Sequence, residues 1–154
     1  MSDPHPPRVV RVAAAVLDAL DRHARDDSPR ECCGLLIGSG DVVSRAVPAR
    51  NDAPGTTRYL INPADHFSAL RAARRDGLSV VGAYHSHPAS APVPSPTDLT
   101  EGLPDFLYLI VSPRQQTPGS DIRAYWLGGD VVAGVAGNSV DRGNYLEAAL
   151  VPVS

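Results

Sequence analysis

The chain has 154 residues, of which 43% are hydrophobic, and its formal net charge at pH 7 is −3. This length predicts one domain with a hydrophobic core, and no apolar run approaches the roughly 18 residues that a membrane-spanning helix requires. The negative charge and the lack of a basic run argue against nucleic acid as the main partner. No positively charged segment followed by an apolar one opens the sequence, so we expect no secretory signal and a cytoplasmic protein with no membrane partner.

Hydrophobic periodicity predicts alternating helices and strands after a flexible lead over residues 1–7. In chain order, the expected elements are a strand at 8–12, a helix from 13 to about 26, strands at 33–37, 42–47 and 58–61, a helix at 63–76, and strands at 78–84, 106–111, 122–127 and 131–135. This order predicts an α/β fold in which one sheet is flanked by two main helices. No Gly-rich phosphate loop follows a strand, which argues against a doubly wound nucleotide-binding fold.

The second helix has a clear start signal and an apolar pattern. Asn62 is a suitable N-cap and Pro63 suits the first helical position. Phe67, Leu70 and Ala73 recur at steps of three, which predicts that they form the core-facing side of this helix.

Some side chains that resemble metal ligands have simpler interpretations. Cys32 and Cys33 are adjacent, so a disulfide between them would be strained, and we expect reduced thiols. Their side chains face opposite sides of a strand, which favours core packing for at least one of them. His23 lies among charged residues of the first helix, and we expect it at the surface.

The stretch His85-Ser86-His87 follows the strand expected at residues 78–84. If the extended conformation continues through residue 87, the two-residue period places both imidazoles on one face of the strand. The two rings would then converge on one point at the carboxyl end of a buried strand.

A later segment of the chain is expected to bring a carboxylate close to the two imidazoles. Ser95 is a natural N-cap, so a short helix should begin here with Asp98 near its third position. His85, His87 and Asp98 would form a three-ligand set that leaves a fourth tetrahedral position for water, which is typical of catalytic zinc.

Glu31 directly precedes the strand expected at residues 33–37 and supplies a carboxyl suited to proton transfer. This Glu, followed by His-Ser-His, seven residues, Ser, two residues and Asp, resembles the pattern of the JAMM (MPN+) zinc metalloproteases. That family cleaves isopeptide and peptide bonds after ubiquitin and ubiquitin-like proteins. The resemblance extends from about Val9 to about Leu127, and no position of the pattern departs from the family.

The resemblance implies a curved mixed β-sheet between helices, with zinc at the end of a strand. This layout is similar to that of the cytidine deaminases. A single catalytic domain would cover residues 8–136, and residues 137–154 would form a tail that packs on it or stays loose.

The resemblance also implies roles for the site residues. One Zn²⁺ held by His85, His87 and Asp98 would lower the pKa of a bound catalytic water to about 7. Glu31 would take a proton from this water and pass it to the departing amine. Ser95 would donate a hydrogen bond to the developing oxyanion, or it would act only as the helix cap.

The expected substrate is a ubiquitin-like or sulfur-carrier protein, because this compact chain has little room for the insertions with which larger members recognise ubiquitin. An extended Gly-Gly tail would add along a free sheet edge, with residues 89–94 and 56–60 as the candidate walls of its slot. A homodimer is compatible with the sequence but not predicted by it.

Two alternatives stay open. The chain could be a processing peptidase that trims residues, or removes cysteine, from a sulfur-carrier protein. It could also be a non-catalytic MPN-type scaffold, although it retains every ligand of the pattern. A zinc deaminase would require His-x-Glu and Pro-Cys-x-x-Cys, and neither occurs.

Overall fold

The computed structural model describes residues 6–127, 138–140 and 143–154. In chain order, its elements are β1 (Val9–Ala13), α1 (Ala14–Asp27), β2 (Cys33–Ser39), β3 (Val42–Ala49), α2 (Pro63–Arg75), β4 (Ser79–Ser86), α3 (Pro96–Glu101), β5 (Leu107–Pro113), β6 (Ser120–Leu127), β7 (Asn138–Val140) and β8 (Gly143–Val153).

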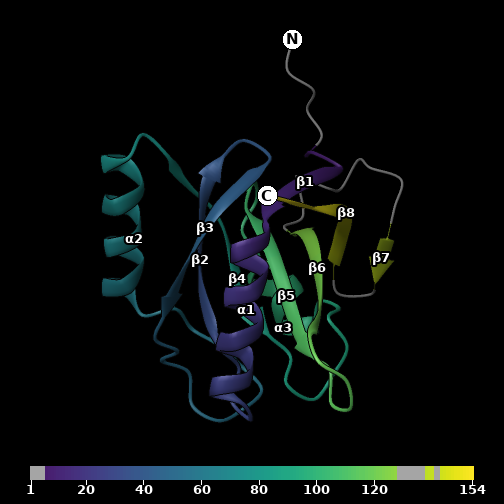
Figure 1. The fold of residues 1–154 in the computed structure, drawn as a ribbon. Coiled ribbons are helices and arrows are strands. Elements are labelled where there is room, and N and C mark those ends of the chain that lie inside the picture. The colour runs from purple at the N-terminus through teal and green to yellow at the C-terminus, as the bar shows by residue number, and fades with distance from the viewer. Residues whose placement is uncertain (1–5, 128–137, 141–142) are drawn as a thin grey trace.

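The strands form one mixed sheet in the order β1-β3-β2-β4-β5-β6-β8-β7. β1 also pairs with β8, so the sheet curves round and closes on itself. α1 crosses the sheet, and α2 packs against β2 and β4 (Figure 1). The predicted α/β fold, a curved mixed sheet flanked by two main helices, is confirmed. Within the described residues, no helix is long and apolar enough to cross a membrane.

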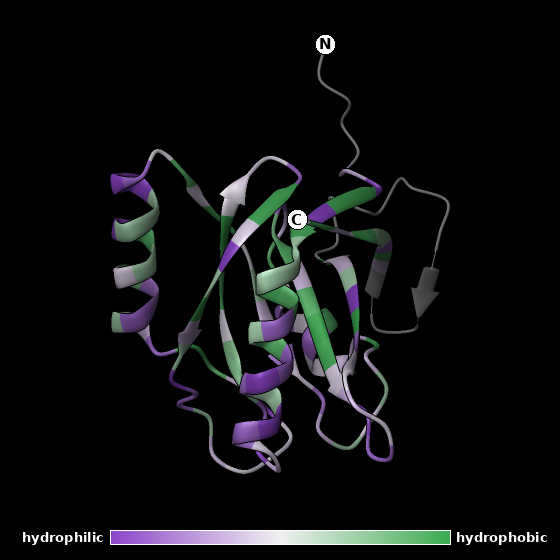
Figure 2. Cartoon of the chain, viewed as in Figure 1, coloured by the Kyte–Doolittle hydropathy of each residue, from purple (hydrophilic) through white to green (hydrophobic). Residues whose placement is uncertain are grey.

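Hydrophobic cores lie on both faces of the sheet. Leu20 of α1 belongs to one core and Ala69 of α2 to the other. Successive residues of β4 point into them alternately, Ala83 toward the α2 side and Tyr84 toward the α1 side. Figure 2 shows that apolar residues dominate the central strand β5. His85 follows Ala83 by two residues and therefore faces the α2 side of the sheet.

The pairing of β2 with β4 fixes the position of the site. The two strands are antiparallel, and Cys33 lies opposite His85. β4 also runs parallel to β5, with His85 opposite Ile110. The residues just before β2, including Glu31, therefore lie beside the residues that follow β4.

The strand predicted at residues 58–61 is wrong. Within this segment, Ile61 alone pairs, in an isolated bridge with Asn51. The Asn51 side chain donates to the carbonyl oxygen of Arg58 at 3.0 Å and accepts from the N–H of Leu60 at 2.9 Å. Because a side chain bonds these backbone groups, they are not available to a neighbouring strand.

The core-facing side of α2 also differs from the prediction. Phe67 is 66% exposed and Leu70 is 44% exposed, whereas Ala69 and Ala73 are buried. The small side chains, four residues apart, allow the helix to approach the sheet closely. The start of the helix is as predicted, because the Asn62 side chain accepts two backbone N–H groups of the first turn.

The C-terminal segment completes the sheet. β8 pairs antiparallel with β6 and parallel with β1. The sequence did not predict this strand, because the mixed composition of the segment carries no clear period. The strand predicted at residues 131–135 lies outside the described residues.

Candidate metal centre

His85 and His87 lie at the carboxyl end of β4 with their Nε2 atoms 3.2 Å apart. His85 is fully buried and His87 is 6% exposed. The backbone N–H of His87 donates to the carbonyl oxygen of Val111 at 2.9 Å, so the chain stays extended beyond the last residue of β4. The two-residue period therefore brings both rings to one face.

Asp98 completes a compact set of donor atoms. Its Oδ2 lies 3.1 Å from Nε2 of His85 and 3.3 Å from Nε2 of His87. A tetrahedral ion with ligand bonds of about 2.0–2.1 Å, as zinc has, needs ligand atoms about 3.3–3.4 Å apart. The three atoms therefore fit one face of such a coordination sphere.

The tautomer of His87 supports a cation at this place. Its Nδ1 lies 2.9 Å from the carbonyl oxygen of Ala91, which can only accept a hydrogen bond, so Nδ1 carries the proton of the neutral ring. Nε2 then presents a lone pair to the carboxylate oxygen of Asp98. Two lone pairs repel each other, so this contact is favourable only when a proton or a metal cation lies between the two atoms. A metal-bound histidine commonly donates its other N–H to a carbonyl group in this way.

The start of α3 aims the Asp98 carboxylate. Oγ of Ser95 accepts from the N–H of Asp98 at 3.0 Å, and Oδ2 of Asp98 accepts from the N–H of Ser95 at 2.9 Å. This reciprocal capping box, with Pro96 at the first helical position, is the predicted helix start. The same carboxylate oxygen that faces the histidines is thus held by the helix cap.

The surroundings shift the pKa values of Asp98 and His85 toward the protonation states that metal ligands require, and shift that of His87 the other way. Burial raises the pKa of Asp98, but contacts with the two histidines and the Ser95 N–H outweigh it and hold that pKa well below its usual range. Burial lowers the pKa of His85. Burial also acts to lower the pKa of His87, but Asp98 and the hydrogen bond to Ala91 outweigh it and raise that pKa. An ionised carboxylate beside a neutral imidazole is ready to bind a cation.

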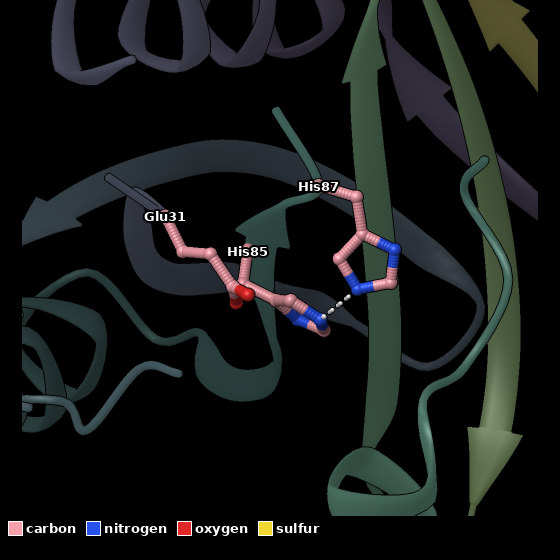
Figure 3. Close-up of side chains that lie close together, drawn as sticks. All are labelled: Glu31, His85 and His87. Atoms are coloured by element: carbon pink, nitrogen blue, oxygen red, sulfur yellow. Dashed lines mark hydrogen bonds between the residues drawn. The ribbon is translucent and has the colours of Figure 1, made fainter. Parts of the chain in front are cut away.

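Glu31 lies at the edge of this set. One carboxylate oxygen is within 4.8 Å of a nitrogen of each histidine, so Glu31, His85 and His87 are themselves a group that could hold a metal ion. Figure 3 shows that the Glu31 carboxylate and the two imidazoles point into the same region. Oδ2 of Asp98, at 3.1 and 3.3 Å from the two Nε2 atoms, lies well within the 4.8 Å limit that describes the Glu31 group.

The environment of Glu31 suits proton transfer. The residue is 8% exposed, and burial raises its pKa from 4.5 to about 7. His87 acts to lower this pKa and Asp98 to raise it, both by smaller amounts than burial. A carboxyl with a pKa near neutrality can accept and release a proton at physiological pH.

Ser86, between the two histidines, connects β4 to the segment of Glu31. Its Oγ accepts from the backbone N–H of Cys32 at 2.8 Å, and its own N–H donates to the carbonyl oxygen of Cys32 at 3.1 Å. Cys32 and Cys33 are both buried and unpaired with each other. Cys32, which follows Glu31, is therefore hydrogen-bonded to Ser86, the residue between the two histidines.

Two further residues contact the site: Tyr59, which lies in the segment 56–60 expected to form a wall of the substrate slot, and Asn51, which was not predicted there. The ring of Tyr59 stacks on His85, with centroids 4.3 Å apart and an angle of 17° between the planes. The Asn51 side chain donates to the carbonyl oxygen of Glu31 at 2.9 Å. An Asn that precedes an Asp-Ala-Pro-Gly stretch is a recognised signal for a side-chain-bonded turn, so Asn51 was open to prediction, whereas no local signal pointed to the stacking of Tyr59 on His85.

The prediction that His23 lies at the surface is wrong. Its side chain is 17% exposed, and its Nδ1 lies 2.7 Å from the hydroxyl of Tyr84. Tyr84 is buried on the α1 face of β4, opposite the metal-binding face. His23 therefore satisfies a buried hydroxyl of the other core.

Among the described residues, the strand that carries the histidines has no free edge. β4 pairs with β2 on one side and β5 on the other, and β2 pairs with β3 on its far side. A substrate segment could therefore not add directly to the strands that carry the histidines. The nearest edge without a strand partner among the described residues is that of β3 after Val43, because β1 pairs with β3 only at Val42 and Val43.

Residues 13–128 match the family described as prokaryotic homologs of the JAB domain. The chain belongs to this family, which confirms the resemblance to JAMM (MPN+) proteins recognised in the sequence.

Similar proteins include a desampylase and a peptidase. The desampylase of Haloferax volcanii is 41% identical over 110 residues, which are 66% of this chain and 79% of that protein. The CysO-cysteine peptidase of Mycobacterium tuberculosis is 35% identical over 111 residues, 69% of this chain and 75% of that protein. A protein from Desulfitobacterium hafniense, solved in solution, matches with a TM-score of 0.76 and 25% identity, covering 94% of this chain and 92% of that one.

Proposed function

We propose that this protein is a zinc metallopeptidase that hydrolyses the peptide or isopeptide bond after the C-terminus of a ubiquitin-like or sulfur-carrier protein. The observation that carries the proposal is the triangle of donor atoms from His85, His87 and Asp98, with the buried carboxyl of Glu31 beside it. The desampylase and the CysO-cysteine peptidase, which are similar over most of their length, support the class of substrate.

His85, His87 and Asp98 would hold one zinc ion, with both histidines binding through Nε2. When bound, zinc supplies a Lewis acid and lowers the pKa of a coordinated water to about 7. Cys32 and Cys33 would not contribute, because burial raises the pKa of each thiol to about 12 and opposes the thiolate that zinc requires.

Glu31 would move the proton during hydrolysis. Its carboxylate would accept a proton from the attacking water and then deliver it to the amine, which is a poor leaving group unless it is protonated. The pKa of about 7 matches both halves of this task, because neither the acid nor the base form of the carboxyl is strongly disfavoured at neutral pH.

Ser95 would stabilise the oxyanion. Its Oγ uses a lone pair to accept the Asp98 N–H. The hydroxyl hydrogen is independent of that bond, so the same group could donate to the developing negative charge of the scissile carbonyl. The capping role and the catalytic role are therefore compatible.

The substrate tail would lie between residues 56–60 and 89–94. The second of these walls is held firmly: the hydroxyl of Tyr125 donates to the carbonyl oxygen of Pro92 at 2.6 Å, and His87 is bonded to Ala91. A wall fixed in this way gives an extended Gly-Gly segment a constant path past the metal.

A panel of three substrates tests the proposal. A ubiquitin-like protein is prepared with its C-terminal glycine joined to a lysine side chain, to the first residue of a linear fusion, or to cysteine. The zinc-loaded protein should cleave at least one of them after Gly-Gly, and a chelator should stop the reaction until zinc is restored. Preference for the cysteine adduct or the linear fusion would favour the processing peptidase, and preference for the lysine linkage would favour the isopeptidase. If the protein cleaves none of the three substrates, the result would contradict the proposal and favour a non-catalytic scaffold.

A further inference from the structure

Asn51 lies two residues after the end of β3 and uses its whole side chain in hydrogen bonds to backbone groups. Its Nδ2 donates to the carbonyl oxygen of Glu31 at 2.9 Å and to that of Arg58 at 3.0 Å. Its Oδ1 accepts the N–H of Ala53 and the N–H of Leu60, each at 2.9 Å. A carboxamide offers two donors and two acceptor lone pairs, so this single side chain is fully satisfied.

Glu31 depends on its backbone for its position. Its carboxylate accepts no hydrogen bond from another side chain among the residues that the structure describes, and its raised pKa comes from burial and nearby charges. The carbonyl group of Glu31 is held by Asn51, and the following N–H, that of Cys32, is held by Ser86. These two bonds fix the peptide unit that follows Glu31 and so the direction in which its side chain leaves the chain.

The other three bonds of Asn51 close the loop at residues 52–60. The backbone of Asp52 adds a further bond, from its N–H to the carbonyl oxygen of Leu60 at 2.8 Å. This loop carries Tyr59, which stacks on His85, and it forms the candidate wall at residues 56–60. Asn51 is therefore bonded both to the segment of the proton-transferring residue and to the loop that faces the substrate.

We propose that Asn51 is a positioning residue that holds the Glu31 segment and the 52–60 loop in one fixed relation, so that the substrate wall and the catalytic carboxyl stay aligned. This inference rests on the proposed function. The donor bond of Asn51 to Glu31 affects the chemical step, whereas its donor bond to Arg58 and its two acceptor bonds close the loop and thereby affect substrate binding. Misplacement of a catalytic group by about 1 Å can reduce the rate about a hundredfold.

Two variants separate these effects. Asn51→Ala removes all four bonds, so kcat should fall between about tenfold and a hundredfold while KM rises severalfold. Asn51→Asp loses the donor bonds to Glu31 and Arg58 but keeps the acceptor bonds to Ala53 and Leu60, so kcat should fall similarly while KM rises less than in Asn51→Ala. Zinc content should stay at one per chain in both, because Asn51 bonds to none of the three proposed ligands.

Asn62→Ala is the matched control. Asn62 caps α2 by accepting the N–H groups of Ala64 and Asp65, and its side chain also bonds to the side chains of Asp52 and Arg50 but not to Glu31. Its loss should lower the melting temperature without changing kcat, because a helix cap is worth about 1 kcal/mol. A fall in kcat for Asn51→Ala that is no larger than that for Asn62→Ala would assign Asn51 a structural role and overturn the proposal.

A second measurement needs no substrate. Trypsin cleavage after Arg58 in the zinc-loaded protein should become at least about tenfold faster in Asn51→Ala, and should increase less in Asn51→Asp, which loses the bond to Arg58 but keeps those to Ala53 and Leu60. An unchanged cleavage rate in Asn51→Ala would overturn the proposal even if the wild type is active. If the wild type cleaves none of the three substrates, the proposed function fails, and with it the catalytic part of the inference; the trypsin comparison still decides whether Asn51 closes the loop.

Discussion

Replacement of Glu31 by glutamine should make the protein more stable and nearly inactive. The substitution preserves the shape of the side chain but removes its charge and its capacity to carry a proton. Glu31 is 8% exposed, and its pKa is raised from 4.5 to about 7 mainly because burial disfavours the ionised form. In the metal-free protein, the folded state therefore binds this proton more tightly than the unfolded state does.

The sign and size of the stability change follow from this difference. Below pH 4.5 the carboxyl is protonated in both the folded and the unfolded state, so its burial does not lower the free energy of unfolding. Between pH 4.5 and about 7 the unfolded state loses the proton first, so the free energy of unfolding falls as the pH rises. Since a tenfold change in proton affinity is 1.36 kcal/mol, the cost above pH 7 is about 3 kcal/mol. Glu31→Gln should recover up to this amount at pH 8 and almost none at pH 4.

Chemical denaturation of the metal-free proteins at pH 4 and pH 8 measures the difference. Glu147→Gln is the control, because Glu147 forms an exposed ion pair with Arg123, and its loss should change stability by less than about 1 kcal/mol at either pH. The zinc-loaded Glu31→Gln protein should lose a factor of about 10² to 10⁴ in turnover, which is the usual contribution of general acid–base catalysis. A variant that is no more stable than the wild type at pH 8 would refute the burial argument, and full turnover would refute the proton-transfer role.

Two further substitutions test the other site residues. His87→Ala should reduce bound zinc below one per chain, because two ligands from His85 and Asp98 do not close the site; retention of stoichiometric zinc after dialysis against a weak chelator would contradict this. Ser95→Ala should lower turnover about a hundredfold if the hydroxyl stabilises the oxyanion, and should also cost about 1 kcal/mol of stability because the cap is lost. A loss of stability with unchanged turnover in steady-state assays would leave Ser95 only its capping role.

The arrangement of the donor atoms followed from short-range rules. A two-residue period is enough to place His85 and His87 on one face, and the Ser95-Pro96 start places Asp98 at the third helical position. The sequence could not show that these segments approach each other, because their distance depends on the pairing of β4 with β2 and β5. For the same reason, the place of Glu31 rested on the family resemblance rather than on its own neighbours.

The failed predictions share a physical cause. The segment at 58–61 has strand-like residues, but Asn51 bonds its backbone groups and competes with strand pairing. In α2 the larger residues, including Phe67, marked the apolar stripe, whereas the close approach of helix and sheet is made by alanines. His23 is polar and surrounded by charges, yet it meets the hydroxyl of Tyr84 from another element. In each case a tertiary contact outweighed a local pattern.

X-ray absorption at the zinc edge tests the proposed metal centre most directly. The wild-type protein loaded with one equivalent of zinc should show four nitrogen or oxygen neighbours at about 2.0–2.1 Å, with the outer-shell signal of two imidazoles. Sulfur at about 2.3 Å would assign the ion to Cys32 or Cys33 and contradict the set of His85, His87 and Asp98. Binding of less than one zinc per chain would contradict it as well.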